Sequence, residues 1–262
     1  MRPLLSIITI NYNNADGLEK TIKSVISQIF SNFEYIVIDG DSNDNSKNIA
    51  NQYLSNIDFY QSEKDTGIYN AMNKGIRVSK GEYLLFLNSG DVLNGANALS
   101  DFINHRDFEG DVIYGDYQFE NGEKIFPDKL SPLFFIRTSL PHQSTLFKKD
   151  IFDKMGMYEE HYSIVADRAF FIKCFLSNQF VFKHINFSLT IYDLSGVSNN
   201  SLYKEKQELE KEKMFRENYG IYFEDYKEMI EMRRQLNEIK KQTISGIIKR
   251  ISNKVKKICT IR

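Results

Sequence analysis

Three aspartates stand where an apolar segment gives way to a polar one, and each suits a different chemistry. Asp91 closes the apolar run LLFLNSGD, where a carboxylate can hold a hard cation such as Mg²⁺ against a diphosphate. Asp39 follows the run YIVI, where an acidic side chain can accept hydrogen bonds from a base or a ribose. Asp167 lies near the start of a predicted helix and is the candidate general base for an attacking hydroxyl.

Each aspartate also has a purely structural interpretation. Asp91 could cap the segment after Gly95, Asp39 could serve a turn, and Asp167 could favour the dipole of its helix. Aromatic residues around Asp167 predict a shielded carboxylate with a raised pKa, which would suit a general base. These neighbours are Tyr162, Phe170 and Phe171.

An alternation of short apolar runs and helical patterns must position these side chains. Strands are predicted near residues 4–10, 35–38, 59–60 and 83–87, with a helical pattern after each of the first three. This order predicts an α/β fold with a doubly wound, mostly parallel central sheet. Ligands of such sheets bind at the carboxyl ends of the strands, where the polar clusters of this chain fall.

The alternation loosens after about residue 115. A short strand is predicted at HQSTLFKK, a helix at IVADRAFFIKCFLSN, and charged helices from Ser201 onward. We therefore divide the chain into residues 1–115 and 116–200, two halves of one domain, and residues 201–262, a helical extension.

Charge is unevenly distributed over the 262 residues. The net charge is −1, yet residues 240–262 carry eight basic side chains and no acidic one. An acidic body argues against nucleic-acid binding. Two cysteines without a CxxC spacing, and no long apolar segment, are typical of a cytoplasmic protein that is soluble or peripheral on a membrane.

The basic tail also has an apolar stripe at helical spacing between Ile244 and Ile258. Such a helix can lie on an anionic membrane surface, or pack on the protein body or a partner. The charged helices before it could pair with each other or form a homodimer.

Six segments, taken together, resemble the family 2 glycosyltransferases with a GT-A fold, particularly those that build bacterial cell-surface polysaccharides. They occur in the family's order over residues 4 to about 198. The segments are SIITINYNN (6–14), YIVIDGDSNDNS (35–46), SEKDTGIYNAMNKGI (62–76), EYLLFLNSGD (82–91), HQSTLFKK (142–149) and IVADRAFFIK (164–173).

The resemblance implies an inverting, metal-dependent glycosyltransferase with a nucleotide-diphosphate sugar donor and a glycan or lipid-linked acceptor. It implies that residues 1–115 are the nucleotide-sugar-binding half of the domain and residues 116–200 the acceptor-binding half. It implies Asp167 as catalytic base and Asp91 as the ligand of Mn²⁺ or Mg²⁺. Nucleotide contacts are implied for Thr9, Asn11, Tyr12, Asp39, Ser42, Asp44, Asp65, Asn73 and Lys74. Contacts to acceptor or diphosphate are expected at His142, Gln143, Ser195 and Ser198.

One departure concerns the metal, because Asn88, Ser89 and Gly90 stand where many relatives have acidic residues. The metal then depends on one direct carboxylate, donor phosphates and water. Rival functions are less well supported: no glycine-rich turn of a dehydrogenase or nucleotidyltransferase follows the first strand. A non-catalytic nucleotide-sugar- or glycan-binding subunit with the same fold stays open as the alternative.

Overall fold

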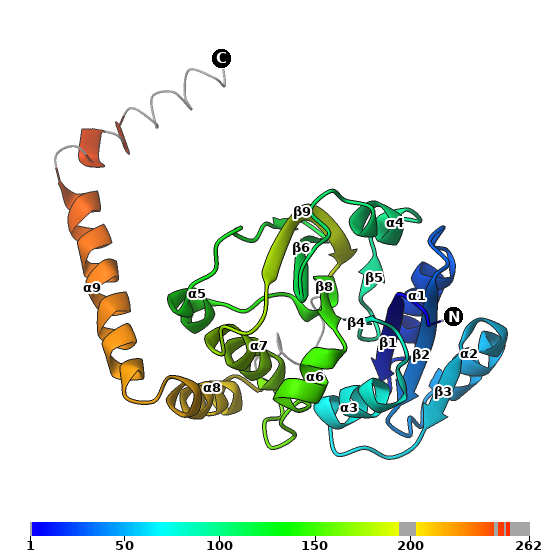
Figure 1. The fold of residues 1–262 in the computed structure, drawn as a ribbon. Coiled ribbons are helices and arrows are strands. Elements are labelled where there is room, and N and C mark those ends of the chain that lie inside the picture. Colours follow the sequence, from blue (N-terminus) through cyan, green and yellow to red (C-terminus); the bar gives the residue numbers. More distant parts are fainter. Residues whose placement is uncertain (1, 194–202, 244–245, 249, 252–262) are drawn as a thin grey trace. The chain divides into compact units, whose positions relative to one another are not determined.

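The first apolar runs form the parallel half of a mixed sheet (Figure 1). Strands β1 (Leu5–Asn11), β2 (Phe33–Asp39), β3 (Phe59–Ser62) and β4 (Tyr83–Phe86) lie in the order β3-β2-β1-β4, and every neighbouring pair is parallel. The computed structural model describes residues 2–193, 203–243, 246–248, 250 and 251.

Strands β1 and β4 are buried at every position, because helices cover both faces of this half-sheet. Leu5 and Ile7 of β1 pack in one core cluster with Leu18 and Ile22 of α1 (Ala15–Ile26), and α2 (Ser46–Gln52) covers the same face. On the other face, a Cβ added at Gly75 of α3 (Ile68–Val78) would lie 2.4 Å from a methyl group of Ile8, so the helix approaches the strand closely. The predicted doubly wound arrangement is confirmed here.

The second half of the sheet is mixed. Strand β8 (Thr145–Lys148) pairs antiparallel with β4 and with β6 (Val112–Phe119), and β6 pairs parallel with β9 (Phe182–Ile191). Short strands β5 (Val92–Leu93) and β7 (Gly122–Lys124) add to β9 and β6. This half therefore departs from pure β-α-β alternation, as the sequence pattern after residue 115 predicts.

Short helices fill the remaining connections. They are η1 (Leu54–Asn56), α4 (Ala98–Ile103), α5 (Pro132–Arg137), η2 (His142–Ser144), α6 (Asp150–Met155) and α7 (Ala166–Leu176). The residue that caps α4 is Asn97, not Asp91, so the capping interpretation of Asp91 is excluded.

Two charged helices follow the sheet, α8 (Lys204–Tyr219) and α9 (Tyr222–Gln242). The chain divides into two compact units, Met1–Met214 and Phe215–Arg262. No helix in the described residues is both long enough and apolar enough to cross a bilayer. Most of the basic tail lies outside the described residues.

Candidate active site

A cavity of about 910 Å³ lies at the carboxyl ends of the first strands and is bounded by both halves of the fold. Six of the residues predicted from the sequence line it: Asn11, Tyr12, Asp65, Asp91, His142 and Asp167. The two carboxylates with the sharpest predicted roles, Asp91 and Asp167, thus share one cavity although they are far apart in the chain.

Asp91 is held at the cavity wall by the turn that follows β4. Its backbone N–H donates to the carbonyl of Asn88 at 2.9 Å, and its carbonyl accepts from the Thr21 hydroxyl at 2.8 Å. Gly90 adopts φ +113°, and a Cβ there would lie 2.3 Å from a carboxylate oxygen of Asp193. Glycine is therefore needed both for the backbone conformation and for the close approach of Asp193.

Burial dominates the electrostatics of Asp91, whose side chain is almost completely covered. Burial raises the pKa of Asp91 to about 6, although the charge of His142 and the N–H of Asp193, 3.0 Å from Asp91 Oδ1, both act to lower it. The charged form of a buried carboxylate is stabilised when a cation approaches, because the cation offsets the lost hydration.

Asp167 lies in the first turn of α7 and faces two partners. The hydroxyl of Tyr69 lies 2.9 Å from Oδ1 and 2.8 Å from the carbonyl oxygen of Ile164, and its one proton is shared between these two acceptors. Nδ1 of His142 lies 3.3 Å from Oδ2. Burial raises the pKa of Asp167, but the hydrogen bonds and the charge of His142 outweigh it, so the net shift is downward.

The predicted raised pKa of Asp167 is therefore wrong. The aromatic neighbours do not enclose the carboxylate: Phe170 stacks on Phe152 with centroids 4.6 Å apart, and Phe171 packs on Phe147. The structure instead supplies a hydroxyl and an imidazole, which favour the ionised form of Asp167.

His142 links the two sides of the cavity. Burial lowers its pKa, and contact with Asp167 raises it by more, so the net shift is upward. With the Nδ1 proton directed at Asp167, Nε2 accepts from the Asn88 amide at 3.1 Å. The amide oxygen of Asn88 is then buried without a hydrogen-bond partner.

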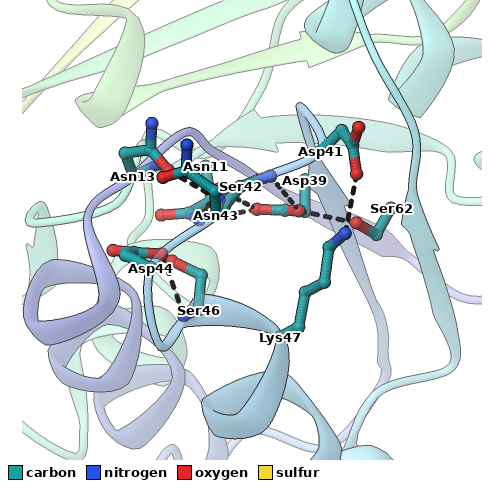
Figure 2. A network of polar contacts seen from close by, with 10 residues as sticks. All are labelled: Asn11, Asn13, Asp39, Asp41, Ser42, Asn43, Asp44, Ser46, Lys47 and Ser62. Atoms are coloured by element: carbon teal, nitrogen blue, oxygen red, sulfur yellow. Dashed lines mark hydrogen bonds and ion pairs between the residues drawn. The ribbon is translucent and has the colours of Figure 1, made fainter.

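The loop after β2 is ordered by a network centred on Asp39 (Figure 2). The Asp39 carboxylate accepts from the Asn11 amide, the Ser62 hydroxyl, and both the N–H and the hydroxyl of Ser42, at 2.6–3.0 Å. Burial raises the pKa of Asp39, but these donors outweigh it and the net shift is downward. Asp39 is fully covered and holds the loop that presents Asp41 to the cavity.

Several other residues predicted to contact the nucleotide do not line the cavity and form hydrogen bonds within the protein. The Thr9 hydroxyl lies 3.0 Å from that of Tyr35 inside the sheet, and Asp44 accepts from the N–H groups of Ala15 and Ser46. Ser42 accepts from the N–H of Asn13.

The α3 residues behave in the same way. Asn73 is bonded to the backbone of Tyr158 and to Glu160, and Lys74 pairs with Glu63 at 2.8 Å. Gln143 is buried and does not line the cavity. Ser195 and Ser198 lie outside the described residues.

The cavity is also lined by residues outside the contacts that the resemblance implies, among them Asn14, Asp41, Lys64, Tyr69, Asn88, Ser89, Tyr192 and Asp193. Tyr69 is the most consequential, because it contacts Asp167 from α3. A signal for it existed, because it lies in the segment SEKDTGIYNAMNKGI, for which the resemblance implies nucleotide contacts.

The sequence of residues 6–171 matches the family described as Glycosyl transferase family 2. A curated relative, the PGL/p-HBAD biosynthesis glycosyltransferase of Mycobacterium bovis (strain BCG / Pasteur 1173P2), is 30% identical over 215 residues, which are 78% of this chain and 82% of the relative. The chain therefore belongs to glycosyl transferase family 2.

Solved structures confirm the GT-A type of fold. S. aureus TarS 1-349 in complex with UDP-GlcNAc has a TM-score of 0.60 and 20% identity, covering 72% of this chain and 58% of that one. The mannosyltransferase PcManGT from Pyrobaculum calidifontis, in complex with GDP-Man and Mn²⁺, has a TM-score of 0.59 and 15% identity, covering 83% and 64%. The chain thus spans about three fifths of the length of these structures.

Proposed function

We propose that this glycosyltransferase moves a sugar, with inversion, from a nucleotide-diphosphate donor to a hydroxyl of a cell-envelope glycan acceptor. The observation that carries the proposal is the placement of Asp91 and Asp167 on one cavity, with His142 between Asp167 and the Asp91 turn. One carboxylate then serves the leaving diphosphate and the other serves the attacking hydroxyl. A single displacement with one base inverts the anomeric centre.

The nucleotide is assigned to the side of the cavity formed by β1, β2 and the segment before α3. Tyr12 is 65% exposed at the cavity wall and offers a ring face for stacking on a base. Asp65 and Asp41 provide acceptors for base or ribose groups, and Lys64 provides a positive charge. Asp39 acts by holding the loop that carries Asp41.

The oxygens around Asp91 fit a hard divalent cation such as Mn²⁺ or Mg²⁺. Asp91 brings a buried carboxylate with a raised pKa, and Asn88 brings an amide oxygen that no donor satisfies. Within the described residues no three acidic, histidine or cysteine side chains cluster as a metal site, so phosphate and water oxygens complete the set. When bound, the cation offsets the charge that develops on the departing diphosphate.

Asp167 is the proposed base. Its lowered pKa keeps it ionised near neutral pH, so it can accept the proton of the attacking hydroxyl. Tyr69 and His142 fix the orientation of its two oxygens.

The acceptor class is proposed from the relatives and from the tail. The mycobacterial relative is named for PGL/p-HBAD biosynthesis, and TarS was solved in complex with UDP-GlcNAc. We propose a lipid-linked acceptor and a peripheral position on the cytoplasmic face of an anionic membrane, held through residues 240–262. In the described part of this segment Ile247, Ile248 and Ile251 are exposed, which suits contact with lipid.

Two experiments test the proposal. Thermal shifts with UDP-, GDP- and dTDP-sugars in the presence of Mn²⁺ identify the donor, and donor turnover is then measured with wild type and Asp167→Asn. Equal turnover by both proteins would exclude Asp167 as the base, and donor binding without any turnover would favour the non-catalytic alternative. Removing residues 240–262 should abolish binding to anionic vesicles, and unchanged binding would contradict the membrane assignment.

A further inference from the structure

The sequence of helix α9, the long helix labelled in Figure 1, repeats its apolar and charged positions every seven residues. Writing the heptad as abcdefg, Met229 and Leu236 fall at position a, and Met232 and Ile239 fall at position d. All four side chains are exposed: Met229 by 36%, Met232 by 55%, Leu236 by 49% and Ile239 by 59%. Alternating steps of three and four residues are the pattern of a coiled-coil seam.

The ion pairs within the helix obey the same repeat. Glu224–Lys227, Glu231–Arg234 and Glu238–Lys241 are all i,i+3 pairs, and in each the acidic residue is at c and the basic one at f. Positions c and f lie on the face opposite to a and d. The helix therefore satisfies its outer charges internally and leaves its apolar stripe uncovered.

The charges that flank the stripe are complementary between two copies. Glu228 falls at g and Arg233 at the e position of the next heptad, and in the described residues neither makes an ion pair. When two identical helices lie parallel and in register, a g residue meets the e residue five positions later on the partner. Glu228 then faces Arg233 of the second copy, twice in each pair of helices.

An antiparallel arrangement and a lipid surface fit less well. Antiparallel helices bring g to g and e to e, which sets like charges or uncharged groups opposite one another. Helix α9 carries five acidic and five basic residues, so it has no net attraction to an anionic bilayer, in contrast to residues 240–262.

We propose that α9 forms a parallel coiled coil with α9 of a second copy of this chain, through Met229, Met232, Leu236 and Ile239. The seam spans Tyr222 to Ile239, about 27 Å of helix at the usual rise per residue. Asp225 at a d position interrupts its beginning, so most of the apolar contact comes from the second half of the helix.

The first test is the mass of the full chain in solution, measured by light scattering after gel filtration over a concentration series. We expect twice the 30.6 kDa of one chain for the wild type and for the outer-face control Asn237→Lys, and a single-chain mass for the double variant Met232→Glu, Leu236→Glu. These side chains are exposed, so folding of residues 1–214, followed by thermal melting, should not change. A monomeric wild type, or a dimer that survives the double variant, would overturn the proposal.

The second test addresses register and direction. Glu228→Arg alone and Arg233→Glu alone should weaken the dimer, and the two together should restore it. In a Cys259→Ser background, Leu236→Cys should form a disulfide between chains under mild oxidation, whereas Asn237→Cys should not. Failure of the combined charge reversal to restore the dimer, or equal cross-linking of both cysteine variants, would refute the parallel pairing. A monomeric protein that binds vesicles through this apolar stripe would show that the stripe contacts lipid and not a second copy of the chain.

Discussion

Replacing Asp91 by asparagine should stabilise the metal-free protein while removing its response to the cation. The pKa of Asp91 rises from 3.8 to about 6 because burial penalises its charged form. Two pH units correspond to about 3 kcal/mol at neutral pH. The asparagine oxygen can still accept from the N–H of Asp193, so most of this penalty should be relieved.

The sign of the pH dependence follows from the direction of the shift. A carboxyl group with a raised pKa binds its proton more tightly in the folded protein than in the unfolded chain. The penalty is therefore absent below about pH 4, grows as the pH rises towards 6, and is complete above it. The stability difference between variant and wild type should shrink accordingly when the pH is lowered from about 7.5 to about 5.

The assay is thermal unfolding by calorimetry, with EDTA and then with Mn²⁺. For a chain of this size about 3 kcal/mol corresponds to roughly 5–10 °C, so metal-free Asp91→Asn should melt about 5 °C or more above wild type near pH 7.5. Mn²⁺ should raise the melting temperature of wild type and leave the variant unchanged. Asp41→Asn, an exposed carboxylate on the same cavity, is the matched control and should keep the response.

Two results would show that the buried charge of Asp91 does not destabilise the fold. One is a metal-free Asp91→Asn protein that is no more stable than wild type at neutral pH, and the other is a difference in melting temperature that does not depend on pH. An undiminished Mn²⁺ response of Asp91→Asn would remove Asp91 from the cation site.

Three further substitutions test the surroundings of the site. Gly90→Ala should lower the melting temperature and impair donor binding, because φ is +113° and the new Cβ would meet the carboxylate of Asp193; an unchanged melting curve would contradict this. Tyr69→Phe should raise the pKa of Asp167, shift the acid limb of the pH–rate profile upward and reduce kcat about tenfold; an unshifted limb would refute the role of the hydroxyl. Asn73→Ala should cost about 1–3 kcal/mol of stability and leave donor affinity unchanged, because its bonds are structural; lost affinity at normal stability would restore it as a nucleotide contact.

The sequence was sufficient to predict the fold and to bring Asp91 and Asp167 to one cavity. Parallel strands expose their carboxyl ends at one edge of the sheet, so a residue directly after an apolar run, such as Asp91, is predicted to reach the site without coordinates. A polar residue inside a strand is harder to place. Thr9 lies within β1 on the face that packs against α1, and its hydroxyl is used by Tyr35.

Contacts between distant segments could not be predicted from the pattern. The family resemblance implies a nucleotide contact for Asn73, yet its amide is used by the segment at Tyr158 and Glu160. The pKa of Asp167 depends on Tyr69 and His142, which approach from other elements. The aromatic residues close to Asp167 in sequence suggested a raised pKa. Phe170 and Phe171 pack on other rings of the core instead, so this prediction failed.

The proposed division of roles between the two carboxylates is best decided by measuring donor binding and turnover in parallel for Asp91→Asn and Asp167→Asn, using the donor identified from the panel and Mn²⁺. Asp167→Asn should bind donor like wild type with turnover lowered by at least about a hundredfold, whereas Asp91→Asn should lose both. Wild-type turnover by Asp167→Asn, or wild-type donor affinity in Asp91→Asn, would contradict these roles.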